Sequence, residues 1–381
     1  MSVLYYVSEK QEEEKMINYI SKGIHTIEIY QRSMSYDKLQ SIVDDLYRYQ
    51  KEAGKIVIVK LCQSKSGINR RYLVLEDIVP DGITMILDQI NPMGGIRFIV
   101  NPSTLYNQDY DPLALYKPGK HSGLIQDAID TIEKVFTDSK HYGSFEHGDW
   151  YFDKEYISLS RIDLTWNLHF DKNTDLTEVI RLFYHADIEK YNLITFEDNE
   201  KNNHSFTITK GPITFTAYDK NHEIENHKNM GYEYDDSILR IEIKTERDGF
   251  KSKFNLEEKV NKYTFDELLR YAYKNRNEIL RNYLDKLFPG TGEHLPYQKT
   301  DAIIQKDANP KYKDAMLYLI KETSRLKNYS RAKEETMKRY NLGKQKYQYL
   351  LDEFDRINIS PITMKKDAKT KCVECFKMLG F

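Results

Sequence analysis

Apolar and polar residues alternate along several segments of the chain, and this alternation is typical of β-strands. The longest such segment covers residues 157–170, ISLSRIDLTWNLHF, and its apolar positions include Ile162, Leu164, Trp166 and Leu168. Because successive side chains of a strand point to opposite faces of a sheet, these residues predict a buried face. Shorter runs predict a hairpin that turns at Lys210-Gly211, and strands over 24–30, 55–62, 70–77, 95–102 and 237–247.

Other segments carry apolar residues at the helical spacing of three and four positions. They predict helices over residues 36–51, 124–136, 174–186 and 264–289. Thr174 is the expected N-cap of the third helix, and Thr264 with Glu267 forms a capping box at the start of the fourth. Strands outnumber helices, and most neighbouring strands are predicted to be antiparallel. We therefore expect an α+β fold built on a mainly antiparallel sheet with packed helices.

The pattern changes after the Gly- and Pro-rich segment FPGTGEHLP. Three helices are predicted over residues 316–326, 330–340 and 344–354, and the turn Asn341-Leu342-Gly343 between the last two is typical of a helix-turn-helix. We expect an α+β domain over residues 1–290, a linker over 291–300 and an all-helical domain over 301–381. The first domain divides into residues 23–138 and a half over 156–290 that carries the polar motifs described below.

The composition and the first residues of the chain predict where the protein is located in the cell. Hydrophobic residues make up 40% of the chain and charged residues 30%, which is ordinary for a globular protein. No apolar run approaches the roughly 18 residues of a membrane-spanning helix, and the first residues show no basic or apolar segment of a secretion signal. Three cysteines give no disulfide framework. These features predict a soluble, cytoplasmic protein without a membrane partner.

Charge is distributed unevenly along the chain. Residues 297–381 carry 19 Lys and Arg against 11 Asp and Glu, whereas residues 1–296 carry 38 against 48. A basic segment attached to an acidic body favours contact with a polyanion through that segment. The alternative is an ordinary solvated helical surface.

Three predicted strands place polar residues on one face each. Tyr218 on one strand, Asp163 on another and Glu242 on a third could meet if these strands share a sheet. Acidic residues hold a hard divalent cation, and a cation that polarises a phosphate allows a phenol to attack it, so this set suits phosphoryl transfer to a tyrosine. The alternative is an amphipathic sheet whose outer face carries cross-strand salt bridges.

The sequence resembles a known family at these positions. SRIDLTW, TFTAYDKN and LRIEIK occur in the order found in the gene II/X family of filamentous-phage and plasmid rolling-circle replication initiators, which is related to relaxase-like initiators. GIHTIEIY and FIVNPSTL are similar to further strands of that family, so the resemblance spans roughly residues 23–290 in short islands. It implies a site-specific DNA-nicking enzyme.

The resemblance also implies roles for individual residues. Tyr218 stands at the position of the nucleophile that forms a 5′-phosphotyrosine. Lys220 stands at that of a lysine which would neutralise the transition state or lower the pKa of the tyrosine. Asp163 and Glu242 match the acidic positions that would bind Mg²⁺ or Mn²⁺. The wider superfamily often uses a paired-histidine metal motif, which this chain lacks. His169, on the Asp163 strand, is a candidate substitute, although a lone histidine there is more often structural.

Other cationic residues are candidate DNA contacts. Arg161 and Arg240 flank the two acidic positions and would bind phosphates or pair with the carboxylates. In the helical domain, Lys344 and Lys346 begin the second helix of the predicted helix-turn-helix, which enters the major groove in that motif. Cys372 and Cys375 form a lone CxxC, which does not complete the four ligands of a structural zinc site.

The resulting hypothesis is a rolling-circle replication initiator that nicks and rejoins single- and double-stranded origin DNA with a divalent metal. The chain has no GxxxxGK phosphate-binding loop, so a host helicase and DNA polymerase would be required as partners. One alternative is a relaxase or initiator of a conjugative element, which uses the same chemistry. Another is a non-catalytic DNA-binding regulator.

Overall fold

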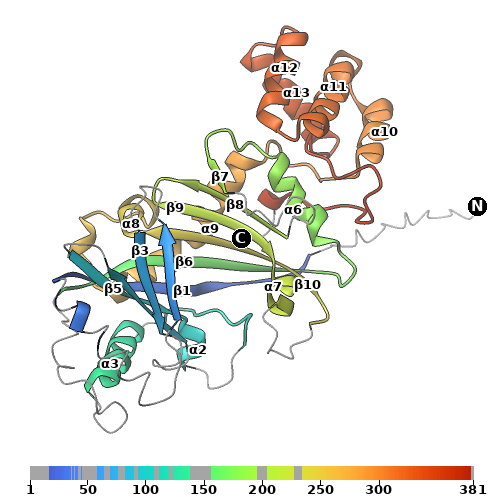
Figure 1. The fold of residues 1–381 in the computed structure, drawn as a ribbon. Helices are drawn as coiled ribbons and strands as arrows, with labels where there is room; N and C mark the ends of the chain where they lie inside the picture. The colour runs from blue at the N-terminus through green and yellow to red at the C-terminus, as the bar shows by residue number, and fades with distance from the viewer. Residues whose placement is uncertain are drawn as a thin grey trace, which may run out of the picture.

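A computed structural model of the chain shows its fold (Figure 1). The structure describes residues 17–35, 58–63, 69–75, 82–89, 93–106, 111–119, 123–137, 156–194, 204–226 and 234–378, together with residues 37, 39–41 and 44. Most of the helix expected over 36–51 lies outside these residues. Within them, no helix combines the length and the apolar character needed to cross a bilayer.

One antiparallel sheet of ten strands organises the described residues, which confirms the α+β prediction. Its order is β2-β3-β4-β5-β1-β6-β10-β9-β8-β7. The strands are β1 (Ile17–Ser35), β2 (Ile58–Gln63), β3 (Asn69–Leu75), β4 (Ile83–Gln89), β5 (Met93–Val100), β6 (Ile157–Phe170), β7 (Asn192–Ile194), β8 (Ser205–Lys210), β9 (Ile213–Asp219) and β10 (Ser237–Glu246). The sequence did not predict β4, while β6 has the bounds that the alternation predicted.

The central strand β1 joins the two halves of the sheet. It pairs with β5 on one side and with β6 on the other. Its register is irregular, because shifts occur at four places, between Ile17 and Tyr19, Ile24 and Thr26, Glu28 and Ile29, and Gln31 and Met34. Each shift marks a bulge or a similar irregularity of the ladder.

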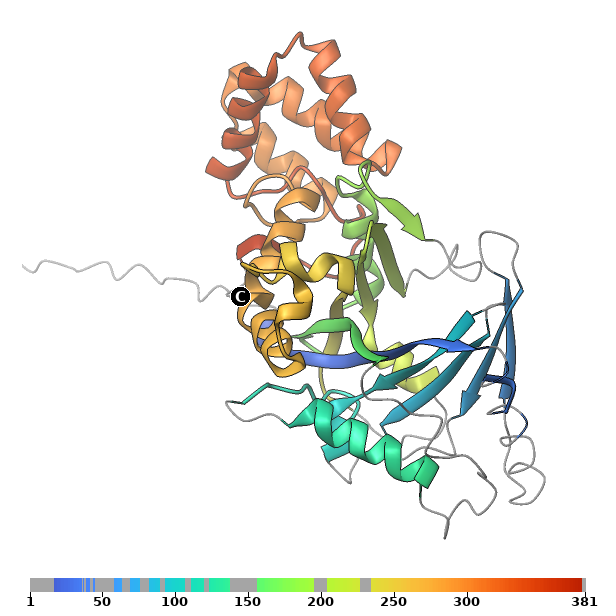
Figure 2. The same ribbon diagram turned by 90° about the vertical axis from the view of Figure 1, so that its left-hand side faces the viewer.

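The apolar face of the sheet carries the core. Leu164, Trp166 and Leu168 of β6 are completely buried, as the alternation predicted. The face is covered by α6 (Leu176–His185), α8 (Arg247–Lys253) and α9 (Phe265–Leu287), as Figures 1 and 2 show. The capping box at Thr264 and Glu267 forms as predicted, whereas the N-cap of α6 is Asp175 rather than Thr174, because the Asp175 carboxylate accepts from the Thr177 amide.

Three further helices follow strands β5 and β9, and one of them, α3 (Leu124–Thr137), also contacts α9. α2 (Pro102–Tyr106) and α3 follow β5, and α3 confirms the helix predicted over 124–136. α7 (Lys220–Asn226) follows β9 directly. Between β8 and β9 the chain turns at Gly211, where φ is +59°, a conformation that favours glycine.

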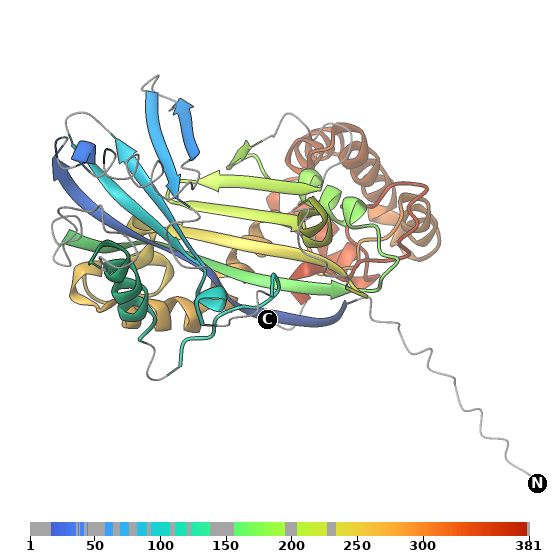
Figure 3. The ribbon, with the colours of Figure 1, turned by 60° about the horizontal axis from the view of Figure 1, so that its bottom comes forward.

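The C-terminal part is helical and projects beyond the β7 edge of the sheet (Figures 1 and 3). It comprises α10 (Tyr297–Asp307), α11 (Pro310–Leu326), α12 (Tyr329–Arg339) and α13 (Lys344–Arg356). The last three confirm predicted helices. α10 was not predicted, and it begins inside the segment 291–300 that was expected to be a linker.

After α13 the chain returns to the sheet. Residues Glu293, His294 and Pro296 form isolated bridges with Ile359, Val373 and Met364 respectively. The segment ends in the 3₁₀ turn η4 (Phe376–Met378), where the Phe376 ring lies 4.8 Å from that of Phe183 in α6. The expected linker is therefore held between the helical part and the core of the sheet.

His294 is completely buried in this joint. Its Nδ1 donates to the carbonyl oxygen of Ile362 at 2.8 Å, and its ring lies between Phe288 and Phe376. Burial lowers the pKa of His294 to about 4, because the imidazolium would lose its hydration there.

The low pKa of His294 predicts a loss of stability in mild acid. The folded-state pKa lies below the unfolded value of about 6.5, so this stabilisation is present above pH 6.5 and is lost as the pH falls toward 4. We expect the free energy of unfolding to fall by about 2 kcal/mol between pH 7.5 and pH 5 from this group. Urea denaturation of the wild type and His294→Gln at both values would measure it. Equal pH dependence in the two chains would contradict the assignment.

Candidate functional site

The three predicted motifs meet on the polar face of the sheet. In the register of β6 and β10, Asp163 lies opposite Lys244 and Thr165 lies opposite Glu242. In the register of β10 and β9, Arg240 lies opposite Tyr218. Residues that are directly opposite share a face, so these side chains stand together on one surface, as the alternation predicted.

Tyr218 contacts one of the two predicted acidic residues. Its hydroxyl donates a hydrogen bond to Oε1 of Glu242 at 3.0 Å. Burial raises the pKa of the Tyr218 phenol well above 10, and the negative charge of Glu242 raises it further. The phenol is therefore held protonated, with its proton directed at a carboxylate.

His25 is a member of this site that the sequence did not reveal. Its Nδ1 lies 3.1 Å from Oε1 of Glu242, and its Nε2 lies 3.4 Å from Nη1 of Arg240. A guanidinium only donates, so Nε2 is the acceptor and Nδ1 carries the proton that Glu242 accepts. Burial alone would raise the pKa of Glu242, but the hydrogen bond from His25 and the charges of Lys244 and Arg240 hold it well below its usual range.

A bulge in β1 directs His25 toward the site. Ile24 pairs with Leu164 and Thr26 pairs with Asp163, so His25 is the extra residue between two consecutive positions of β6. The signal was present in the spacing of core residues. Ile24 and Ile27 lie opposite Leu164 and Ile162 of the apolar face although they are three positions apart, and a strand places two such residues on one face only if one residue is inserted between them.

Asp163 occupies the neighbouring position on the same face. Its Oδ2 accepts from the Thr26 hydroxyl, and its Oδ1 accepts from Nε of Arg161 at 2.9 Å. Arg161 also donates from Nη1 to Glu28 at 3.1 Å. Arg161 therefore pairs with the carboxylates, which is one of the two roles expected for it, and it remains half-buried at the surface.

The donor set fits a hard cation in its chemistry. Asp163 and Glu242 are diagonal neighbours in the ladder, a spacing of roughly 7–8 Å between Cα atoms. Thr165 lies next to Asp163 on this face and opposite Glu242, and its buried hydroxyl has no hydrogen-bond partner within the described residues. Oxygen ligands of this kind suit Mg²⁺. Among the described residues, however, no group of three or more His, Cys, Asp or Glu side chains is arranged so that it could hold a metal ion.

Arg240 has an internal position instead of the expected DNA contact. The side chain is completely buried. Its Nε donates to Oδ1 of Asn167 at 2.7 Å, and its Nη2 donates to the carbonyl oxygen of Pro112 at 2.7 Å. Arg240 therefore fixes the segment 111–119 over the sheet, and the expectation of a phosphate contact was wrong for this residue because the same segment covers it.

His169 lies outside the site. Its ring stacks on Tyr19 with centroids 3.7 Å apart, and its Nδ1 lies 3.1 Å from Oδ2 of Asp236. It is six residues from Asp163 on an extended strand, about 20 Å at the usual rise per residue. The two residues cannot share a cation, so the expected role of His169 as a ligand was wrong.

Lys220 is close to the site but is engaged by its own helix. It is the first residue of α7, it is buried, and its ammonium pairs with Glu223. Lys244 forms an ion pair with Glu242 instead, with Nζ 3.8 Å from Oε2. Lys244 is partly exposed, so it is available to an incoming anion.

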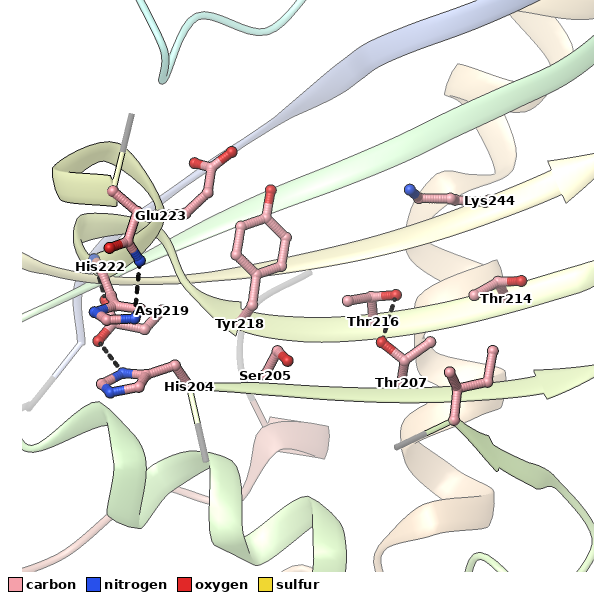
Figure 4. A pocket seen from close by; sticks show the side chains of 12 residues that line it. His204, Ser205, Thr207, Thr214, Thr216, Tyr218, Asp219, His222, Glu223 and Lys244 are labelled. Atoms are coloured by element: carbon pink, nitrogen blue, oxygen red, sulfur yellow. Dashed lines mark hydrogen bonds and ion pairs between the residues drawn. The ribbon is translucent and has the colours of Figure 1, made fainter. Parts of the chain in front are cut away.

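A pocket of about 540 Å³ opens beside Tyr218 (Figure 4). The Tyr218 ring stands in its middle, with Thr207, Thr214 and Thr216 on one side and the stacked rings of His204 and His222 on the other. A second, polar cavity of about 230 Å³ lies beside Arg161. The polar face thus offers space on both sides of the carboxylates.

The remaining predicted residues lie elsewhere. Lys344 and Lys346 are exposed at the start of α13, in the helical part. Cys372 contacts Glu293 with Sγ 3.1 Å from Oε2, and burial raises the pKa of its thiol to about 12. Cys375 is buried nearby, and both cysteines are free thiols.

Comparison with known proteins gives little guidance. No family model and no curated protein matches the sequence. Among solved structures, the chain is similar to the di-domain ARO/CYC BexL from the BE-7585A biosynthetic pathway, with 10% sequence identity and a TM-score of 0.19. The match covers 67% of this chain and 98% of that chain. So low a TM-score carries no argument, and function has to be inferred from the site.

The buried position of Arg240 predicts a large effect on stability. We expect Arg240→Met to lower the free energy of unfolding by about 3 kcal/mol or more, because it leaves the Asn167 amide oxygen and the Pro112 carbonyl buried without a donor. Lys244→Met on the same strand is the matched control and should cost less than about 1 kcal/mol. Urea denaturation would compare them, and similar losses would show that Arg240 does not organise the site.

Proposed function

We propose that this protein is a DNA-nicking enzyme that initiates rolling-circle replication, with Tyr218 as the nucleophile. The observation that carries the proposal is the hydrogen bond from the Tyr218 hydroxyl to the buried Glu242 on a face that also holds Asp163. The resemblance of the three strand motifs to rolling-circle initiators of phages and plasmids supports the same assignment. Single-stranded DNA at a replication origin would be the substrate.

The proposed reaction is a transesterification. The phenolic oxygen of Tyr218 forms a bond to the scissile phosphorus, and the bond from phosphorus to the 3′ oxygen breaks. The phenolic proton passes to Oε1 of Glu242, and the leaving 3′ oxygen takes a proton from water. The product is a 5′-phosphotyrosine and a free 3′ hydroxyl, and the reverse reaction rejoins the strand.

Transfer of the proton from Tyr218 to Glu242 is unfavourable by itself, because the pKa of Tyr218 is high and the pKa of Glu242 is low. Positive charge on the polar face would offset this cost. Lys244, which lies opposite Asp163, and Arg161, which pairs with Asp163, would stabilise the charge that develops on the phosphate. A divalent cation held by Asp163, Thr165 and Glu242 would polarise the phosphate as a Lewis acid when bound.

Partners follow from the proposed reaction. A nicked origin supplies a 3′ primer, so extension needs a DNA polymerase, and displacement of the parental strand needs a helicase. The sequence carries no phosphate-binding loop of an ATPase. Both activities would therefore come from the host cell.

The nucleophile can be identified by the covalent adduct. We expect Tyr218→Phe to abolish the protein–DNA adduct that the wild type forms with a single-stranded origin oligonucleotide, because only the hydroxyl is removed. Oligonucleotide affinity should stay within about twofold, measured by anisotropy. Denaturing gels would detect the adduct, and Tyr184→Phe on α6 is a matched control that should retain it. An adduct with Tyr218→Phe would transfer the role to another tyrosine; Tyr234 would be tested first, and then Tyr232, which lies outside the described residues.

The dependence of adduct formation on a divalent cation can be tested by removing and restoring the metal ion. We expect EDTA to abolish the adduct and Mg²⁺ or Mn²⁺ to restore it. Asp163→Asn should weaken Mn²⁺ binding, measured by calorimetry, by at least about tenfold, because it removes an oxygen ligand. Glu246→Gln, an exposed acid at the end of β10, is the control and should leave Mn²⁺ affinity unchanged. Full adduct formation in EDTA would exclude the proposed cation.

A further inference from the structure

The helices α11, α12 and α13 pack as a three-helix unit whose last two helices are joined by a tight turn. Asn341 adopts a left-handed conformation in that turn, with φ at +48°, and the Leu342 amide donates to the Met337 carbonyl at 2.9 Å. The buried hydroxyls of Tyr329 and Tyr347 bond at 2.6 Å and tie α12 to α13. The angle between the two helices is therefore fixed by both the turn and the core.

α13 has two distinct faces. Tyr347, Leu350 and Phe354 are buried against the rest of the unit. The opposite row, which we call the reading face, is exposed along its whole length and consists of Lys344, Gln345, Gln348, Tyr349 and Asp352. These residues follow the spacing of one, four and five positions that brings side chains onto one side of a helix.

The two glutamines of the reading face are held by their neighbours one turn away. Gln345 donates from Nε2 to the Tyr349 hydroxyl at 3.0 Å, and Gln348 donates from Nε2 to Oδ1 of Asp352 at 2.9 Å. These bonds restrain the two carboxamides at the exposed surface of the helix. A carboxamide donates and accepts in one plane, which matches the N7 and N6 edge of adenine in the major groove.

The charges of α13 are separated along its length. Lys344 and Lys346 lie in its first turn, whereas Asp352, Glu353 and Asp355 lie near its C-terminal end. In the preceding helix α12, Glu335 lies 3.5 Å from Arg325 of α11, so part of its charge is compensated within the unit. Cations next to the hydrogen-bonding side chains at the N-terminal end of α13 suit a nucleic acid. A helix of this width fits the major groove of B-form DNA, whereas the major groove of A-form RNA is too narrow.

We propose that α13 enters the major groove of duplex DNA and reads A·T base pairs through Gln345 and Gln348, with Lys344 and Lys346 on the flanking phosphates. The cavity beside Tyr218 belongs to the β8 and β9 end of the sheet, so this is a second DNA site. The reading of duplex DNA does not depend on the nicking reaction proposed above. It gives the chain a means to choose where a single strand is presented for cleavage.

The test uses the full chain carrying Tyr218→Phe, so that no cleavage disturbs binding. Selection from a random duplex library should enrich a motif that contains adenine. Gln348→Ala and Gln345→Ala should each lower the preference for one A·T pair by about fivefold or more, without a change in the salt dependence. Gln305→Ala on α10 is the matched control and should leave the motif unchanged.

Lysine variants test the phosphate contacts. Lys344→Ala and Lys346→Ala should weaken binding to all duplexes alike, and each should reduce the slope of log affinity against log salt by about 0.9. Lys321→Ala on α11 is the control. All these side chains are exposed, and circular dichroism would verify that each variant is folded.

Three outcomes would overturn the proposal. They are a selection that enriches no sequence, glutamine variants that keep the wild-type motif, and lysine variants that match the Lys321 control. The adduct assay with Tyr218 intact separates this result from the nicking proposal. A chain that selects a duplex motif but forms no adduct refutes nicking alone, and a chain that forms the adduct but selects nothing refutes the reading by α13 alone.

Discussion

The candidate site depends on one buried cation, Arg240, in the centre of an antiparallel sheet. A guanidinium without solvent must have its donors satisfied, and here Asn167, the Pro112 carbonyl and His25 accept them. The contact to His25 also decides which ring nitrogen is protonated, so it directs the His25 proton to Glu242. Glu242 in turn receives the Tyr218 hydroxyl. A single desolvated charge therefore sets the orientation of His25 and, through it, of the carboxylate beside the phenol.

This arrangement places strongly perturbed groups side by side. The Tyr218 phenol, whose pKa is raised by burial, donates a hydrogen bond to the Glu242 carboxylate, whose pKa is held low. A hydrogen bond from a phenol to a carboxylate favours such opposed shifts in any protein, and sites for group transfer also use them to hold a proton until substrate charge arrives. Lys244 and Arg161 are partly exposed on the same face, so positive charge lies beside the carboxylates at the surface.

Local patterns predicted much of this architecture, and non-local contacts explain what they missed. The alternation over residues 157–170 was sufficient for β6 and for the face shared by Asp163 and Glu242. His25 was missed because a bulge shifts the alternation by one position. The burial of Arg240 was missed because its cover, the segment 111–119, comes from a distant part of the sequence. His169 is six positions from Asp163 along an extended strand, and this distance alone excludes it from the site. A comparison of motifs does not take that distance into account.

The irregular course of β1 also bears on how the chain folds. β1 pairs with β6, whose residues follow it by well over 100 positions, and such long-range pairing is slow because a large loop must close first. Until β6 arrives, one edge of β1 has no strand beside it, and a long regular strand in that state is a template for aggregation. In the folded chain the register shifts interrupt the β1 ladder at intervals, and interruptions of this kind make a strand a poor template for a second chain. The bulge that aims His25 is one of these interruptions.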